Sequence, residues 1–274
     1  MDESTRLQVL TDIKRYEELG EFDRHTDPVD MSLALPVDEN FPYIPKGFTR
    51  IKYFLQRVFI VYPFRKKMNR EILKTQFFGR ENLADVPSGI ITCNHVNKFD
   101  CLAVGQAAKG HRVYTVGAPF NNMKGFMGDM MRAGGLLPLS ENLSAGKSFN
   151  RAVAHYLKTG NYVAVYPEQS MWWNYEKPRP FKDGAFTLAV INKVPVIPMF
   201  ITFRHSGEYD DNGIEKKYMS VHIMKPIYPR DDLTRHQNIA YMRDENYRMC
   251  CDKYREVYGT PLTYTTRSGN TAEE

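Results

Sequence analysis

The sequence has no internal repeat and no apolar run long enough to cross a bilayer. A membrane-spanning helix needs about 20 consecutive, mostly apolar residues, so the sequence predicts no transmembrane segment. The first residues, MDESTRLQVLTDIKRYEELG, are polar and acidic and lack the apolar core of a signal peptide. We therefore expect a cytoplasmic protein. Its 274 residues suit one sizeable domain with an appendage, or two small domains.

Cysteine is also scarce. The four cysteines are Cys93, Cys101, Cys250 and Cys251. No two of them form a CxxC pair, which argues against a zinc site and against a disulfide framework. We expect no metal and no other cofactor.

Charge is distributed unevenly along the chain. Residues 1–45 contain eleven acidic and four basic residues, a net charge of −7. Residues 46–80 contain ten basic residues and one acidic residue, a net charge of +9. A basic block of this kind indicates an anionic partner, either nucleic acid or an anionic membrane surface.

The N-terminal part of the chain contains two helical patterns. Residues 4–19 have apolar side chains at helical spacing, and residues 23–47 contain four prolines and indicate an irregular connector. Residues 48–62 form a second pattern that ends at Pro63. This second helix is amphipathic, basic and rich in aromatic residues, which is typical of a helix in a membrane interface. The alternative is a helix that packs on the protein's own core and exposes a solvated basic face.

From residue 77 onward, strand patterns alternate with helix patterns. Strands are expected at residues 90–93, 113–116, 135–139, 162–166, 194–203 and 218–224, and helices at residues 100–109, 144–158, 185–193 and 233–258. This alternation predicts an α/β fold with a mostly parallel central sheet flanked by helices. We expect an N-terminal helical segment over 1–75, the α/β domain over 76–258 and a flexible tail over 259–274.

A histidine and an aspartate follow the first of these strands. His95 comes directly after the apolar strand, and Asp100 lies five positions later. The loops after the carboxyl ends of parallel strands carry the ligand site in open α/β sheets. An aspartate that holds one imidazole nitrogen leaves the other as a base. The alternatives are that Asp100 caps the following helix and that His95 is a satisfied core histidine.

Several segments resemble the blocks of the glycerolipid acyltransferases, the family of 1-acyl-glycerol-3-phosphate acyltransferases. They occur in the family's order: FFGRENL (77–83), NHVNKFD (94–100), GGLLPLS (134–140), VYPEQS (165–170), PFKDGAF (180–186) and VPVIPMFI (194–201). The resemblance implies that His95 removes the proton of an acceptor hydroxyl while Asp100 orients the imidazole. The hydroxyl would then attack an acyl thioester without an acyl-enzyme intermediate.

The resemblance also implies the partners and the binding residues. The donor would be acyl-CoA or acyl carrier protein, and the acceptor a lysophospholipid such as 1-acyl-glycerol-3-phosphate. The motifs place the expected substrate-binding residues at Asn94, Glu168, Gln169, Ser170, Lys182 and Gly184. Glu168, in particular, is expected to help bind the acceptor, and the alternative is an exposed turn carboxylate.

Two arginines that grip the acceptor phosphate in the family are absent. The second block continues with Glu141, and the third with Gln169 to Trp172. An arginine fork is the usual ligand for phosphate. The candidate substitutes are Lys182, Arg179, Lys98 and Arg132, and Lys182 matches the family's Phe-Lys-x-Gly position. A different lysolipid or an amino-lipid acceptor stays open.

The pair Trp172 and Trp173 is a further departure from the family pattern. We expect these side chains to contact the acyl pocket or the membrane, and the alternative is that they fold back into the core.

Three other functions compete with this interpretation. The basic block would serve a nucleic-acid-binding protein, but it leaves the ordered motifs unexplained. A catalytically silent lipid-binding relative would account for the missing arginines. Cys93 would be the nucleophile of a Cys-His enzyme, although cysteines in apolar strands are mostly inert. We expect a phospholipid-biosynthetic O-acyltransferase, attached to the inner face of the membrane through residues 47–75, that binds no nucleic acid.

Overall fold

The computed structural model describes residues 3–29, 31–211 and 213–266, and this part of the chain forms a seven-stranded sheet. Its strands are β1 (Gln76–Phe78), β2 (Gly89–Thr92), β3 (Val113–Gly117), β4 (Leu136–Pro138), β5 (Tyr162–Val165), β6 (Val196–Tyr209) and β7 (Glu215–Ile223). The spatial order is β1-β7-β6-β2-β5-β3-β4. All neighbouring strands pair in parallel except β6 and β7, which pair in antiparallel. The predicted mostly parallel α/β fold is confirmed.

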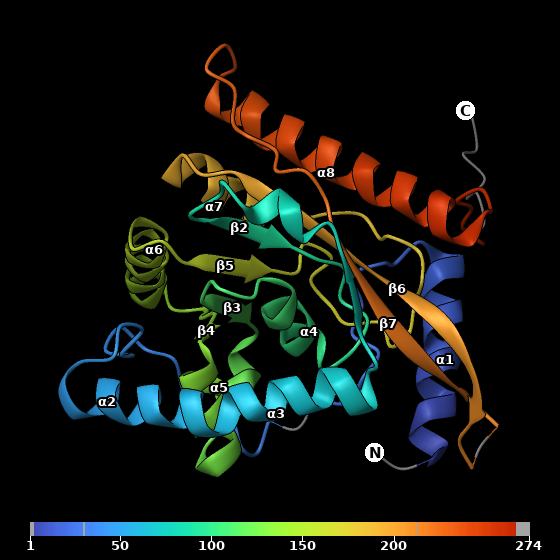
Figure 1. The fold of residues 1–274 in the computed structure, drawn as a ribbon, viewed down its shortest axis with the longest axis horizontal. Helices are drawn as coiled ribbons and strands as arrows, with labels where there is room; N and C mark the ends of the chain where they lie inside the picture. The colour runs from blue at the N-terminus through green and yellow to red at the C-terminus, as the bar shows by residue number, and fades with distance from the viewer. Residues whose placement is uncertain (1–2, 30, 212, 267–274) are drawn as a thin grey trace, which may run out of the picture.

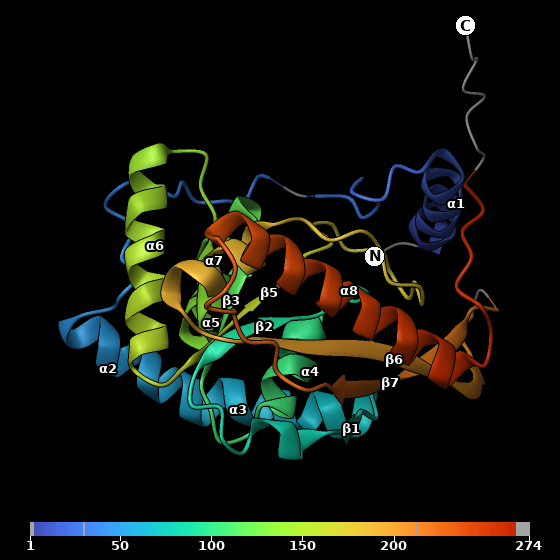
Figure 2. The ribbon, with the colours of Figure 1, turned by 90° about the horizontal axis from the view of Figure 1, so that it is seen from above.

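Helices cover both faces of the sheet (Figure 1). The helices of the domain are α4 (Asp100–Ala107), α5 (Gly125–Gly134), α6 (Leu143–Lys158), α7 (Gly184–Asn192) and α8 (Arg235–Tyr258), with short 3₁₀ turns at Arg80–Leu83 and Pro119–Asn121. Of these, α6, α7 and α8 pack on one face, and α4 packs on the other (Figure 2). The sequence did not reveal α5, and it did not reveal β1.

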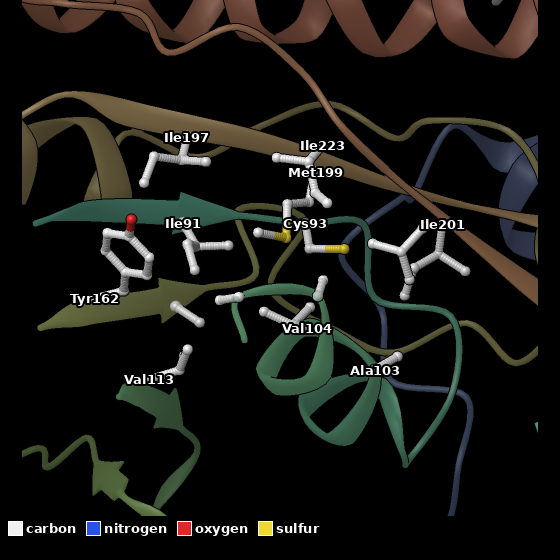
Figure 3. Close-up of a cluster of buried hydrophobic side chains, with 14 of the residues drawn as sticks. Ile91, Cys93, Ala103, Val104, Val113, Tyr162, Ile197, Met199, Ile201 and Ile223 are labelled. Atoms are coloured by element: carbon white, nitrogen blue, oxygen red, sulfur yellow. The ribbon is translucent and has the colours of Figure 1, made fainter. Parts of the chain in front are cut away.

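The alternation of side chains in β2 divides the core into two layers. Ile90 points into the layer under α6 and α7, and Ile91 points into the layer under α4. In Figure 3, Ala103 and Val104 of α4 lie toward Ile91 and Cys93. Because β2 lies between β5 and β6 and is buried on both faces, the loop that follows it begins from a fixed point.

One continuous helical segment crosses the molecule below α4 in Figure 1, and α5 packs beside it. It consists of α2 (Gly47–Gln56), a π-helical turn (Arg57–Val61), α3 (Tyr62–Lys67) and a second π-helical turn (Met68–Ile72). The prediction that Pro63 ends the helix is wrong. Pro63 lies in the first turn of α3, directly after the π-helical turn, where the N–H of Tyr62 donates to the carbonyl oxygen of Arg57. A proline at such a position removes no hydrogen bond that the helix needs.

This long helix, residues 47–72, has its apolar side turned outward. Phe48 is 81% exposed and Phe59 is 71% exposed. Further large exposed apolar side chains on it are Ile51, Phe54, Leu55, Ile60, Phe64 and Ile72. The side that packs on the domain carries polar residues, among them the buried Arg57 and Asn69. The alternative of an apolar face packed on the protein's own core is therefore wrong.

No helix within the described ranges combines the length and the apolar content that a bilayer crossing requires.

The N-terminal helix and the residues that follow α8 pack against each other. In α1 (Glu3–Leu19), Val9 and Ile13 form a buried cluster with Trp172. The hydroxyl of Thr266 donates to the carbonyl oxygen of Glu17. The predicted flexible tail is therefore wrong for residues 259–266, and residues 267–274 lie outside the described part of the chain.

The connector between α1 and α2 packs beyond the carboxyl ends of β3 and β4. Ala34 forms a β-bridge with Met123. The hydroxyl of Ser140 donates to the carbonyl oxygen of Val37, and the hydroxyl of Tyr43 donates to the carbonyl oxygen of Pro138. The segment is irregular, as predicted from its prolines, but these hydrogen bonds hold it against the domain.

Candidate active site

The site begins at Asn94, which follows β2. Its side-chain amide donates to the carbonyl oxygen of Ile201 at 2.9 Å and accepts from the N–H of Ile201 at 2.7 Å. The side chain therefore extends the pairing of β2 with β6 by one rung. Asn94 is fully buried. Its assignment as a substrate-binding residue is wrong, because both ends of its amide are bonded to the backbone and it fixes the exit of the strand.

His95 and Asp100 meet across the turn that leads into α4. His95 Nδ1 lies 2.9 Å from Asp100 Oδ2. The same carboxylate oxygen accepts from the backbone N–H groups of Val96 and Asn97. These residues precede α4, and the Asp100 side chain does not cap that helix. The carboxylate therefore holds the loop and the imidazole together.

The imidazole of His95 is fixed on one side and accessible on the other. Its ring stacks on the ring of Tyr166, with centroids 4.2 Å apart. A quarter of the His95 side chain, 25%, is exposed, so it is not a closed core histidine. Nδ1 faces Asp100, while Nε2 has no partner among the described residues. This arrangement leaves one ring nitrogen free to accept a proton.

Glu168 and Arg179 hold the backbone of His95. Both side chains are fully buried, and Arg179 Nη2 donates to Glu168 Oε2 at 2.8 Å. Glu168 Oε2 accepts from the N–H of His95, and Arg179 Nη2 donates to the carbonyl oxygen of His95. Ser170 is fully buried, and its hydroxyl accepts from Arg179 Nη1 at 3.1 Å. These residues face one another and position His95, and the expected acceptor-binding roles of Glu168, Ser170 and Arg179 stay predictions.

The remaining motif residues lie at the surface around this network. Gln169 is exposed and has a φ of +72°, a left-handed conformation that favours glycine. Lys182 is exposed, and its ammonium group pairs with Asp23 at 2.8 Å. Gly184 begins α7, and no other group lies close enough to touch a side chain at this position. Substrate binding by these three residues stays a prediction.

The two tryptophans have separate environments. Trp172 is fully buried, and its indole N–H donates to the carbonyl oxygen of Arg24. Its expected contact with the acyl pocket or the membrane is wrong, since it packs with α1. Trp173 is half-buried, and the guanidinium of Arg6 lies 4.1 Å from the centroid of its ring.

A cavity of about 480 Å³ adjoins the His95 loop. Its lining includes Asn97, Lys98 and Phe99 from that loop, Trp173, and Arg6 and Asp27 from the N-terminal segment. Among the residues whose side chains are described, neither Arg6 nor Lys98 forms an ion pair. The lining also contains acidic residues and further lysines, so the cavity carries charges of both signs: Asp27, Glu71, Glu208, Asp210, Glu215, Lys74, Lys216 and Lys217.

Asp27 is within electrostatic reach of Arg6, Lys98 and His95. Burial raises the pKa of its carboxyl, while the charges of Arg6, His95 and Lys98 lower it. Arg6, Asp27 and Lys98 line the cavity, and His95 lies outside its lining. Sequence reasoning missed Arg6 and Asp27, because both lie far from the motif blocks and reach the cavity only through the packing of α1 and its connector.

Two further candidates are accounted for by their surroundings. Arg132 donates to Asn122 at 2.8 Å and to Asp129 at 3.0 Å, so its guanidinium is already occupied. Burial raises the pKa of the Cys93 thiol well above its usual range, which disfavours the thiolate that a nucleophile requires. Across the described residues, no three His, Cys, Asp or Glu side chains gather closely enough to hold a metal ion.

Comparisons with known proteins agree with this geometry. Residues 74–202 match the family model described as Acyltransferase. The matched segment contains all the blocks identified from the sequence, so the resemblance to the glycerolipid acyltransferases is confirmed.

The named proteins to which the chain is similar come from a yeast and a bacterium. The chain is 28% identical over 164 residues to a 1-acyl-sn-glycerol-3-phosphate acyltransferase of Saccharomyces cerevisiae. This alignment covers 57% of this chain and 52% of the yeast protein. The chain thus matches about half the length of this curated relative. The crystal structure of PlsC, the 1-acyl-sn-glycerophosphate acyltransferase of Thermotoga maritima, matches with a TM-score of 0.50 at 18% identity, over 79% of this chain and 90% of that chain. At this identity the likeness concerns the fold.

The buried pair predicts a large stability effect. Arg179→Gln leaves the carboxylate of Glu168 buried without its cation, so we expect the free energy of unfolding to fall by about 3–5 kcal/mol. Denaturant unfolding measures this change. The matched control is Arg248→Gln, because Arg248 forms an exposed pair with Glu245 and its loss should change the stability little. Equal effects of the two substitutions would contradict the role assigned to the buried pair.

Proposed function

We propose that this protein transfers a fatty acyl group from an acyl thioester to the hydroxyl of a lysophospholipid. The observation that carries the proposal is the contact of His95 Nδ1 with Asp100, which leaves Nε2 free in an accessible loop. The name of the yeast relative, a 1-acyl-sn-glycerol-3-phosphate acyltransferase, supports the same reaction. Acyl-CoA and acyl carrier protein are the two donor classes.

The reaction follows from the state of the imidazole. Nε2 of His95 accepts the proton of the acceptor hydroxyl, while Nδ1–H remains hydrogen-bonded to Asp100. The acceptor oxygen attacks the thioester carbonyl carbon, the carbon–sulfur bond breaks, and the leaving thiolate takes the proton from Nε2. General base catalysis of this kind contributes roughly 10²–10⁴-fold. Positioning of the two substrates supplies further acceleration.

The acceptor headgroup occupies the cavity beside the His95 loop. Arg6 and Lys98 take the place of the two arginines that the motif blocks lack, since both are free of ion pairs within the described residues. Lys182 and Arg132 are each paired with an aspartate. A headgroup phosphate between Arg6 and Lys98 would lie next to the catalytic loop. Lysolipids that carry a phosphomonoester are therefore the favoured acceptors.

The long helix attaches the protein to the membrane surface. Its exposed apolar side is extended by Phe126 and Met127 of α5, which packs beside α2. Exposed apolar patches of this size mark interaction surfaces. Basic residues next to them, such as Lys66 and Lys67, add attraction to anionic lipids. An apolar side that faces outward favours the membrane over nucleic acid as the anionic partner.

Substitution of His95 and of Asp100 tests the proposed general base. We expect His95→Ala to lower kcat for transfer of a labelled acyl group to a lysophospholipid by a factor on the order of 10²–10⁴, and Asp100→Asn to lower it by a similar factor because the imidazole loses its orientation. The matched control is His155→Ala, an exposed histidine on α6. Full activity of His95→Ala would reject the proposed reaction.

The headgroup site is tested with paired acceptors. Each charge-assisted hydrogen bond is worth about 1.5–3 kcal/mol, so Arg6→Gln and Lys98→Gln should each lower kcat/KM for a phosphomonoester lysolipid about 10- to 100-fold. A lysolipid with an uncharged headgroup should show no such loss. Lys14→Gln, an exposed position on α1, is the control. Equal losses with both acceptors would show that the two cations do not recognise phosphate.

Membrane attachment is tested with vesicles. A buried Phe side chain contributes about 1.5–3 kcal/mol, so Phe54→Ser and Phe59→Ser should each weaken binding to anionic vesicles at least tenfold. Ile191→Ser removes an equally exposed apolar side chain from α7 and should leave the affinity unchanged. Vesicle co-sedimentation measures the affinity. If all three variants bind alike, another surface is responsible.

A further inference from the structure

The long helix turns arginines toward the protein while its apolar residues face outward. Arg57 is only 9% exposed, although it lies in a helix whose outer side is open. Arg65 is also half-buried, and its guanidinium lies against Gly105 of α4. Arg112, directly before β3, lies on the domain beneath the same helix, and it is half-buried as well. Three arginines thus gather at the interface between the long helix and the domain.

These arginines lack the acidic partners that buried cations normally have. Lys52, the neighbouring cation of this interface, forms an ion pair with Asp129 at 2.5 Å. Among the described residues, the guanidinium groups of Arg57, Arg65 and Arg112 form no ion pair and no hydrogen bond. The Nε atoms of Arg65 and Arg112 are buried without a partner. A buried charge without a partner costs free energy, so the cluster indicates an anion.

An aromatic ring lies close to each of the three arginines, and Arg57 lies 5.7 Å from the ring centroid of Phe54. Arg65 lies 4.6 Å from the ring centroid of Tyr62, and Arg112 lies 4.2 Å from that of Tyr114. Burial lowers the pKa of Arg112, and the positive charge of Arg57 lowers it further. The phenol of Tyr62 raises the pKa of both Arg65 and Arg112. The repulsion between Arg57 and Arg112 would be relieved by an anion between them.

The position of the cluster indicates which anion it meets. An interfacial helix sinks its apolar face ~5–10 Å into the boundary of headgroups and acyl chains. The helix is about 10 Å across, so its inner side comes to the level of the lipid phosphates. Arg57, Arg65 and Arg112 lie on or beneath that side. A guanidinium is the usual ligand for phosphate at such a site.

We propose that Arg57 and Arg112, with Arg65 beside them, bind the phosphate of an anionic phospholipid headgroup beneath the long helix. This site is separate from the cavity beside His95, since none of the three arginines lines that cavity. It binds a lipid of the membrane surface and not the acceptor. The inference rests on the membrane attachment proposed above, and it adds a specific headgroup contact to the apolar one.

The test uses a soluble lipid, so that a bilayer is not required. Dihexanoyl phosphatidylglycerol, an anionic phosphodiester lipid, should raise the unfolding temperature of the full-length protein by several degrees, because a ligand that binds only the folded state stabilises it. The shift should be absent in Arg57→Gln/Arg112→Gln. It should persist in Lys66→Gln/Lys67→Gln, which removes the same charge from exposed positions of the same helix.

Two further arms identify the source of the phosphate. Coenzyme A and inorganic phosphate should produce no shift that depends on Arg57 and Arg112. A shift with coenzyme A that disappears in the Gln pair would assign the cluster to the acyl donor and overturn the lipid. The absence of any shift with phosphatidylglycerol in the wild type would also overturn the proposal.

Stability without ligand separates binding from a structural role. Because unpaired buried charges are removed, Arg57→Gln/Arg112→Gln should unfold at the wild-type temperature or above it in phosphate-free buffer. A lower unfolding temperature together with an unchanged lipid shift would mean that the arginines only support the fold. If Phe54→Ser/Phe59→Ser binds vesicles as the wild type does and retains the lipid shift, the apolar attachment is rejected and the arginine site is kept.

Discussion

The ion pair between Glu168 and Arg179 connects three segments that lie far apart in the chain. One carboxylate oxygen accepts from the N–H of His95, and the guanidinium donates to the carbonyl oxygen of the same residue. The guanidinium also donates to Phe22 of the N-terminal connector. Because both groups are fully buried, neither can turn to water without a large cost. The orientation of the His95 loop therefore depends on this pair, and the N-terminal segment is tied to the same point.

The second constraint is the long helix with its apolar side outward. In a helix that serves the core, the apolar stripe faces inward; here Phe48 and Phe59 face outward and Arg57 faces inward. The two π-helical turns maintain a continuous helix through Pro63. The apolar side and the arginine cluster beneath it belong to one surface. The chemistry of the apolar side fits the acyl chains of a lipid bilayer, and that of the arginines fits the headgroup phosphates.

Sequence reasoning succeeded where local pattern decides structure. The alternation of strands and helices predicted the mostly parallel sheet, and the strand that ends before His95 placed the site at its carboxyl end. The offset of five residues between His95 and Asp100 predicted a contact across a turn, which the 2.9 Å distance bears out. Sequence reasoning failed where residues that contact each other are distant in the chain. It did not predict that Glu168 and Arg179 hold the backbone of His95, because these contacts are supplied by folding.

The sequence by itself determined the fold class, the order of the motif blocks and the histidine with its aspartate, because each depends on residues close together in the chain. Only the tertiary structure decided which cations remain free. Lys182 is paired with Asp23, while Arg6 reaches the cavity because α1 packs on the loop that contains Trp172 and Trp173. The direction of the apolar side of residues 47–72 was also decided by packing. Periodicity shows that a helix has two sides, but contacts with the rest of the protein determine which side is buried.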